Sequence, residues 1–203
     1  MLDSSNSASE VDAAARILAA GGIVVYPTET LYGLGADAGN AAALQRLVEL
    51  KGREPAKPIA VLISDTKMLE DVVDEISEAA ANLMRRFWPG PLTIVLRARP
   101  SVSRVLTGGG DGIGVRVSSH PIATRLVRAL GRPLTAPSAN PAGQRPPTRL
   151  EDARAYFGDR VDYYVDGGHL PGEPASTVVD ARHGLQVIRD GAVPAHLVLQ
   201  QAV

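Results

Sequence analysis

Two short polar clusters hold the residues of this chain that are best suited to chemistry. The first is residues 51–58 (KGREPAKP) and the second is residues 137–140 (PSAN). Of the 21 basic residues only three are lysines, and two of these three lie in the first cluster. A lysine ammonium is a compact point charge on a flexible stem, whereas an arginine guanidinium is a planar fork. The first cluster is therefore typical of a site for phosphate oxygens, which an ammonium can meet from several directions.

Each cluster also has a purely structural interpretation. Lys51 and Arg53 could follow a helix whose C-terminal dipole attracts cations, but this leaves Lys57 unexplained. Ser138 and Asn140 could belong to a hydrogen-bonded turn and nothing more. The hypothesis of a phosphate site therefore depends on both clusters together, and it requires that folding brings them side by side.

A third polar segment, residues 27–33 (PTETLYG), carries two threonine hydroxyls and a phenol directly after a predicted buried strand. These groups favour a pocket for a small polar substrate, although the threonines could instead satisfy the backbone amides of a turn. This segment, both clusters and Arg116 all fall at the predicted ends of strands or in adjoining loops. Ligands of α/β sheets bind in such places.

Hydrophobic patterning predicts an α/β fold in which strands and helices alternate before three strands close the chain. Helices are expected at residues 10–20, 40–50, 77–88 and 121–131, and caps at Ser7, Asn40, Ser77 and Thr148. Strands are expected at residues 23–26, 58–63, 92–96, 113–117, 134–136, 161–165, 177–180 and 185–188. This order favours one twisted mixed sheet flanked by helices over a parallel β/α barrel.

Length and composition predict one domain. A chain of 203 residues with 45% hydrophobic residues can form its own core, which at 4% aromatic residues must be mainly aliphatic. We expect a flexible N-terminus over residues 1–9 and a single domain over residues 10–203. The polar first ten residues and the lack of a long apolar run predict a cytoplasmic protein with no membrane span.

Several kinds of site are excluded. No cysteine is present, so disulfides, thiolate metal sites and a cysteine nucleophile are ruled out. The four histidines, at positions 120, 169, 183 and 196, lack the spacing of a zinc site. Residues 33–38 (GLGADA) match a dinucleotide fingerprint only loosely, and no Walker A sequence occurs. Neither a Rossmann site nor a P-loop is expected.

The charge is distributed unevenly along the chain. The net charge is −1, yet residues 1–84 carry −7, residues 85–160 carry +9 and residues 161–203 carry −3. The basic middle third predicts an electropositive surface suited to phosphates or RNA. Most of these arginines could equally lie on solvated helix faces, and Arg125, Arg128 and Arg132 are the first candidates for that.

Seven motifs occur in the order known from one protein family. They are PTET-x-YGLGADA at 27–38, KGREPAKPI at 51–59, WPGPLT at 88–93, VRVSSHP at 115–121, APSANPAG at 136–143, STVVD at 176–180 and IRDGAV at 188–193. In these motifs the chain resembles the YrdC/Sua5 family of threonylcarbamoyl-AMP synthases, over about residues 22–191. It is similar to the short form of that family, which has a single YrdC-like catalytic domain and no further C-terminal domain.

The resemblance implies a fold, an activity and partners. The fold would be the single-domain YrdC-like fold with a concave electropositive face. The activity would join L-threonine, bicarbonate or CO₂, and ATP into L-threonylcarbamoyl-AMP, with release of pyrophosphate and with Mg²⁺ bound to ATP. The product would go to a separate complex that modifies tRNA, and the protein itself could contact tRNA. No side chain is an evident base for the threonine amine, which leaves bicarbonate as the candidate.

The same motifs imply roles for ten residues. Those with catalytic roles would be Lys51, Arg53, Ser138 and Asn140. Those that bind ATP would be these four together with Lys57 and Arg189. Those that hold threonine would be Thr30, Tyr32, Arg116 and Ser176, with Arg116 on the carboxylate and Tyr32 near the carbamoyl group. No metal ligand is implied, and Leu62 stands where some relatives have a histidine near the threonine.

Two other functions fit parts of the sequence. A non-catalytic module for double-stranded RNA or tRNA would use the basic middle third, and steep salt dependence of binding without nucleotide turnover would favour it. The chain is poor in the aromatic residues that stack on bases, and this module would leave Thr28, Thr30 and Ser138 unexplained. The other candidate is a paralogue of the same fold with a different acyl acceptor, since a fold does not by itself determine chemistry.

Overall fold

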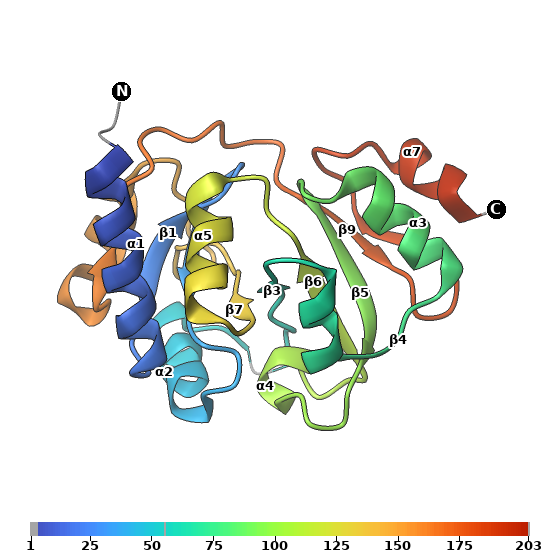
Figure 1. The fold of residues 1–203 in the computed structure, drawn as a ribbon, viewed down its shortest axis with the longest axis horizontal. Coiled ribbons are helices and arrows are strands. Elements are labelled where there is room, and N and C mark those ends of the chain that lie inside the picture. Colours follow the sequence, from blue (N-terminus) through green and yellow to red (C-terminus); the bar gives the residue numbers. More distant parts are fainter. Residues whose placement is uncertain (1–3, 55, 203) are drawn as a thin grey trace.

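The computed structural model describes residues 4–54 and 56–202 (Figure 1). Its α-helices are α1 (Ser4–Ala19), α2 (Ala41–Lys51), α3 (Glu78–Phe87), α4 (Arg104–Thr107), α5 (Pro121–Leu130), α6 (Leu150–Phe157) and α7 (Ala195–Leu199). Short 3-10 helices are η1 (Thr66–Asp71), η2 (Gly158–Arg160) and η3 (Gln200–Ala202). Its strands are β1 (Val24–Pro27), β2 (Tyr32–Gly35), β3 (Val61–Leu62), β4 (Val73–Glu75), β5 (Leu92–Ala98), β6 (Gly112–Arg116), β7 (Leu134–Thr135), β8 (Tyr163–Tyr164), β9 (Thr177–Asp180) and β10 (Gln186–Arg189).

The strands form two hydrogen-bonded sheets. The larger sheet has the order β10-β9-β5-β6-β3-β7, with β4 paired to β5, and the smaller has the order β2-β1-β8. Both sheets are mixed: β5–β9 and β1–β8 are parallel pairs, whereas β5–β6 and β1–β2 are antiparallel. The predicted α/β class with mixed strand pairing and flanking helices is confirmed, but the expectation of one sheet is wrong, because the strands form two sheets.

Residues 133–139 connect the two sheets. On one side, the amide of Ala136 donates to the carbonyl of Ala60, 2.8 Å away, next to β3. On the other side, the amide of Leu34 in β2 donates to the carbonyl of Pro137 at 2.8 Å, and Gly33 pairs with Ser138 in an isolated bridge. The second polar cluster therefore lies at the junction between the sheets.

Helices cover the smaller sheet because their apolar stripes pack on β1. Helices α1 and α5 lie side by side in front of that strand (Figure 1). Their inward-facing residues form one core cluster with Val24 and Tyr26 of β1, and Leu18 and Leu126 belong to it. Helix α5 begins with Pro121, which cannot donate an intrahelical hydrogen bond, and ends at Gly131 in the left-handed conformation (φ 68°).

Two of the four predicted helix caps are confirmed. The side chains of Asn40 and Ser77 accept hydrogen bonds from backbone amides three residues ahead, at the starts of α2 and α3. The predicted cap at Thr148 is wrong, since Arg149 precedes α6 and no side chain caps that helix. The cap at Ser7 is also wrong, because α1 begins at Ser4. Part of the segment 1–9, namely residues 1–3, lies outside the described residues, and residues 4–9 belong to α1.

Strand β2 and several short elements were not predicted. The segment of β2 has two glycines among four residues and looks like a loop, but it pairs with β1 along its whole length. Strand β4 and helices α4 and α7 were missed because each has five residues or fewer, too few for a periodic pattern. The predicted strand at 58–63 is only Val61–Leu62.

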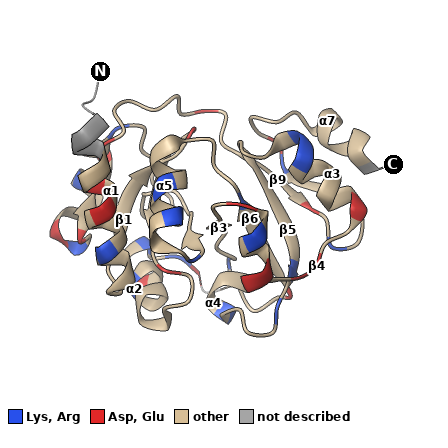
Figure 2. Ribbon diagram, in the orientation of Figure 1, with Lys and Arg blue, Asp and Glu red and all other residues tan. Residues whose placement is uncertain are grey.

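Helices α1 and α3 carry both basic and acidic residues, whereas α5 carries only arginines (Figure 2). Arg125 and Arg128 of α5 are exposed, in keeping with solvated helix positions, whereas Arg132 forms an ion pair with the buried Asp37 at 2.8 Å. The concave electropositive face remains a prediction. Of the helices in the described residues, none combines the length and the hydropathy needed to cross a bilayer.

Candidate active site

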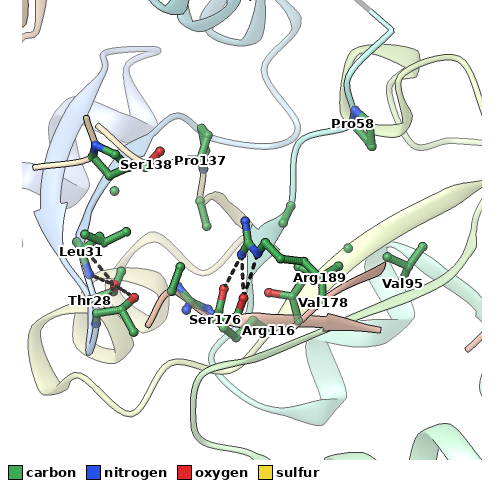
Figure 3. Close-up of a pocket in the computed structure, with 18 of the residues that line it drawn as sticks. Thr28, Leu31, Pro58, Val95, Arg116, Pro137, Ser138, Ser176, Val178 and Arg189 are labelled. Carbon is green, nitrogen blue, oxygen red and sulfur yellow. Dashed lines mark hydrogen bonds between the residues drawn. The ribbon is translucent and has the colours of Figure 1, made fainter. Parts of the chain in front are cut away.

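A cavity of about 350 Å³ opens where the two polar clusters meet. Its walls come from the segment after β1, the segment after α2, strands β5, β6, β9 and β10, and the junction segment after β7. Thr28, Leu31 and Ser138 form one wall, with Val95 and Val178 across from them (Figure 3). Eight of the ten predicted site residues line the cavity: Thr30, Tyr32, Lys51, Arg53, Arg116, Ser138, Ser176 and Arg189.

Lys51 joins the two clusters. It is the last residue of α2, and Gly52 ends that helix in the left-handed conformation (φ 56°). The buried Lys51 ammonium donates to the backbone carbonyls of Ser138 at 2.5 Å and Asn140 at 2.7 Å. The carbonyl of Lys51 in turn accepts from the amide of Ala142 at 2.7 Å. The proximity that a single shared site requires is therefore present.

The electrostatics of Lys51 follow from its position. Burial, and second the nearby positive charge of Arg53, lower the pKa of the Lys51 ammonium to about 8. An ammonium has three donors, and two of them are used by the carbonyls of Ser138 and Asn140. One donor and the positive charge are thus left for a ligand in the cavity.

Arg53 lines the cavity with an unsatisfied donor. One terminal nitrogen donates to the carbonyl of Pro58 at 3.0 Å. The Nε–H is buried and has no hydrogen-bond partner among the described residues. Burial lowers the pKa of the Arg53 guanidinium from its ordinary value. A half-buried cation with a free buried donor is an environment that an anion stabilises.

Lys57 and Asn140 do not line the cavity. Lys57 is exposed and lies 3.5 Å from the carboxylate of Glu54. The amide nitrogen of Asn140 donates to the carbonyls of Pro141 at 2.9 Å and Gln144 at 2.8 Å, and its buried Oδ1 has no partner in the described structure. Asn140 therefore shapes the loop whose carbonyl Lys51 binds, and the ATP-binding roles of both residues remain predictions.

Arg189 and Ser176 form the wall contributed by β9 and β10. The guanidinium of Arg189 donates to the carbonyl of Ser176 at 2.7 and 3.1 Å and to its hydroxyl at 3.1 Å (Figure 3). Gly191 permits this approach, because a Cβ atom there would lie 2.2 Å from the carbonyl oxygen of Ala175. Partial burial, and second the charge of Arg116, lower the pKa of Arg189.

Tyr32 and Arg116 are both held by protein partners. The Tyr32 hydroxyl donates to the carbonyl of Gly168 at 2.8 Å and accepts from the amide of Gly167 at 3.0 Å, and burial raises its pKa to about 12. Arg116 is buried and forms an ion pair with Glu29 at 3.1 Å. Tyr32 stays neutral at physiological pH, whereas Arg116 adds a charge to the cavity wall.

Comparison with known families identifies the fold. The sequence profile of the Sua5, YciO and YrdC proteins, described as "Telomere recombination", matches residues 16–191. The chain belongs to the Sua5/YciO/YrdC family. The resemblance inferred from the seven motifs is thereby confirmed.

Three relatives show how closely the chain follows this family. The threonylcarbamoyl-AMP synthase of Pyrococcus abyssi is 41% identical over 182 residues, which cover 89% of this chain and 54% of the relative. That of Halorhodospira halophila is 38% identical over 176 residues, which cover 87% of this chain and 92% of the relative. The crystal structure of P. abyssi Sua5 complexed with L-threonine matches with a TM-score of 0.90 at 38% identity, covering 94% of this chain and 56% of the other. The chain thus spans about half the length of the P. abyssi protein.

Two residues at or beside the cavity of this Sua5/YciO/YrdC member, Thr93 and Glu29, were not anticipated from its sequence, and Leu62 lies away from the cavity. Thr93 of β5 lines the cavity, but a threonine inside an apolar strand gives no signal of a site. Glu29 lies between two predicted pocket threonines and pairs with Arg116, a contact that no sequence pattern indicates. Leu62, where some relatives have histidine, is fully buried in the core cluster of α1 and α5 and does not line the cavity.

The segment that carries the first cluster rests on α4. The amide of Ile59 donates to the carbonyl of Leu106 at 2.8 Å. Gly108, which ends α4 at φ 63°, lies so close that a Cβ atom there would be 2.5 Å from the carbonyl oxygen of Ala56 and 2.9 Å from the nitrogen of Pro58. Because Arg53 donates to the carbonyl of Pro58, this contact also supports the Arg53 guanidinium.

Replacing Gly108 with alanine should destabilise the protein more than the same change at Gly131. Both glycines end a helix in the left-handed conformation, which costs an alanine about 1–2 kcal/mol. A Cβ atom at Gly131 meets no atom within 4 Å, so Gly131→Ala is the matched control. Gly108→Ala should lose about 1–3 kcal/mol more through overpacking, as measured by urea unfolding. Equal losses in the two variants would contradict the close contact.

Binding of inorganic tripolyphosphate should weaken as the pH rises through about 8. The folded pKa of Lys51 lies below its ordinary value of 10.5, so its ammonium is charged at pH 7 and neutral above about 8. Between pH 8 and 10.5 the unfolded chain holds a proton on Lys51 that the folded protein has lost. The free energy of unfolding therefore rises with pH across this range. Calorimetric titration on both sides of pH 8 measures the affinity. The Lys51→Arg variant keeps its charge, and an identical fall in that variant would exclude Lys51 as the cause.

Proposed function

We propose that this protein is an L-threonylcarbamoyl-AMP synthase. It would join L-threonine, ATP and the carbon of bicarbonate or CO₂, and release pyrophosphate. Support comes from the relatives named threonylcarbamoyl-AMP synthase at 38–41% identity and from the matching Sua5 structure complexed with L-threonine. The observation that carries the proposal is the cavity itself, whose lining combines the cations of Lys51 and Arg53, the latter with an unsatisfied Nε–H, with the hydroxyls of Ser138 and Ser176.

The proposed reaction brings anions together. A carbamate forms on the threonine amine, its oxygen attacks the α-phosphorus of ATP, and the bond to the pyrophosphate oxygen breaks. Lys51 and Arg53 would offset the charge of the triphosphate, with Arg189 and Ser138 completing the nucleotide site. Catalysis would consist of positioning and electrostatic stabilisation without a covalent enzyme intermediate. Lys57 would contact the triphosphate after its own loop moves. Asn140 would support the loop of residues 138–140.

The other end of the cavity would hold the amino acid. Thr30 and Ser176 present hydroxyls there, and Arg116 presents a guanidinium suited to a carboxylate. Tyr32 lines the cavity with its hydroxyl bound to residues 167–168, so we assign it to shaping the pocket beside the carbamoyl group. No histidine or carboxylate lines the cavity among the described residues. Bicarbonate is therefore the acceptor that we propose for the proton of the threonine amine.

Mg²⁺ would enter as part of the ATP substrate. Its preferred ligands are oxygens, above all carboxylates, phosphates and water. In residues 4–54 and 56–202, no three histidine, aspartate or glutamate side chains gather as a metal site would need. The hydroxyls and cations that line the cavity are suited to the phosphate and water shell of Mg²⁺-ATP, while ATP supplies the oxygens that hold the ion.

The product would be passed on within the cytoplasm. Threonylcarbamoyl-AMP is a mixed anhydride that water hydrolyses, so a separate transfer complex must consume it soon after release. That complex would place the threonylcarbamoyl group on N6 of an adenosine in tRNA. Direct contact of this chain with tRNA, through the basic residues 85–160, would assist the transfer.

Incubation with ATP, Mg²⁺, bicarbonate and one amino acid at a time tests the proposal. Mass spectrometry should detect an acyl-adenylate with L-threonine, and pyrophosphate should appear only when threonine and bicarbonate are both present. A product with another amino acid alone would favour a paralogue with a different acceptor. Salt-sensitive RNA binding with no pyrophosphate release would instead favour the non-catalytic module.

A further inference from the structure

Glu29 is a largely buried carboxylate beside the cavity, and no role has been given to it so far. Its side chain is only 13% exposed and that of its partner Arg116 only 7%, with 3.1 Å between the charged atoms. The flanking residues Thr28 and Thr30 line the cavity, whereas Glu29 does not. Burial of a carboxylate is costly unless it is paired, so its presence behind the cavity wall needs an explanation.

Ser118 is the second side chain that binds the Glu29 carboxylate. Its hydroxyl forms a hydrogen bond with the second carboxylate oxygen of Glu29 and accepts from the amide of His120 at 3.1 Å. His120 in turn caps α5, since its Nδ1 accepts from the amide of Ile122. The two oxygens of Glu29 thus have different partners, one being Arg116 and the other Ser118, which lies just before α5.

The Arg116 guanidinium has donors left over. A guanidinium carries five N–H groups, and one of its nitrogens is bound by Glu29. The other nitrogens have no acceptor among the described residues, and Arg116 lines the cavity. Glu29 holds one terminal nitrogen of the Arg116 guanidinium, while the N–H groups of the other nitrogens stay free for an anion. Glu29 also offsets one of the four positive charges, from Lys51, Arg53, Arg116 and Arg189, that surround the cavity.

We propose that Glu29 is a positioning residue for recognition of the substrate's α-carboxylate. Glu29 holds the guanidinium of Arg116 with its free N–H groups toward the cavity, and Ser118 holds Glu29. The inference depends on the proposed function, because it concerns the amino-acid end of that site. It also explains why the pocket segment carries an acidic residue beside a site for anionic substrates.

The test compares two ligands that differ in the carboxylate. L-Threonine has it, and 1-amino-2-propanol is the same molecule without it. NMR titration of the unmodified protein, Glu29→Gln and Ser118→Ala gives the affinity of each ligand. Glu29→Gln should weaken L-threonine binding about ten- to a hundredfold, the range for a charge-assisted hydrogen bond, and leave 1-amino-2-propanol binding unchanged. Ser118→Ala should act in the same direction with a smaller effect.

Controls separate positioning from loss of folding. Glu49→Gln changes an exposed glutamate on α2 and should leave both affinities unchanged. In Arg116→Met, the further change Glu29→Gln should cost nothing more, because the group that it positions is gone. Equal losses for both ligands, or additive losses in the double variant, would overturn the positioning role.

Failure of the proposed function would look different. If the unmodified protein binds no L-threonine, the amino-acid site itself is wrong, and the inference about Glu29 falls with it. If the unmodified protein binds L-threonine and Arg116→Met abolishes the preference over 1-amino-2-propanol while Glu29→Gln does not, only the inference fails.

Discussion

Replacing Lys51 with alanine should lower turnover about a hundred- to a thousandfold, as removal of one preorganised charge-stabilising group does in other enzymes. The variant loses a positive charge beside the phosphates and also the two hydrogen bonds to the carbonyls of Ser138 and Asn140. The carbonyl of Asn140 then loses its bond from Lys51, and the carbonyl of Ser138 keeps only the amide of Asn140 at 2.9 Å, so residues 138–140 should shift away from the cavity. Threonine-dependent release of pyrophosphate measures the turnover.

The third lysine of the chain provides the matched control. Lys67 is exposed on η1 and does not line the cavity, so Lys67→Ala should keep full activity. Lys51→Arg keeps the charge but cannot reproduce the compact ammonium between two carbonyls, and its activity should lie between the other two. Near-normal turnover of Lys51→Ala would remove the basis for placing the phosphates beside Lys51.

Arg53→Ala should have an effect of similar size, about a hundred- to a thousandfold on turnover. The reason differs from that for Lys51, because the Nε–H of Arg53 is buried with no partner in the described structure. An anion bound in the cavity would satisfy that donor, and its free energy of binding would include the gain. The variant should therefore also bind ATP more weakly, which calorimetry measures in the absence of threonine.

Two further variants show whether activity needs the planar guanidinium of Arg53 or only its positive charge. Arg53→Lys keeps a positive charge and loses the planar pair of donors, so it should recover only part of the activity. Arg125→Ala removes an exposed arginine from α5 and should change nothing. An Arg53→Ala enzyme with normal ATP affinity and reduced turnover would place Arg53 on the transition state alone.

The helices were predicted where local chemistry decides them. Asn40 and Ser77 cap α2 and α3 because a short polar side chain reaches the free amides of the first turn. The same motif at Thr148 has no such role, since α6 begins one residue later than the motif requires. Strand β2 was missed because its glycine-rich sequence has no preference for a strand, and pairing with β1 and with residues 137–139 imposes one.

The site was predicted in its parts but not in its internal contacts. Eight of the ten residues expected from the motifs line one cavity. The direct hydrogen bonds from Lys51 to the second cluster, and the pairing of Arg116 with Glu29, appear only in the folded chain. Residue type indicates what a side chain can bind, whereas its partner depends on which distant segment packs against it.

The sequence alone predicts an α/β fold and two polar clusters, one with cations and one with a hydroxyl and an amide. Its seven ordered motifs also predict membership in one family. These follow from local rules: hydrophobic period, helix caps and the spacing of residues within a motif. Only the tertiary structure brings residues 51 and 138–140, which are 87 and more positions apart, into hydrogen-bond contact, and only it pairs Glu29 with Arg116. The physical reason is that burial, desolvation and the choice of a partner depend on packing between segments, and a linear pattern does not encode them.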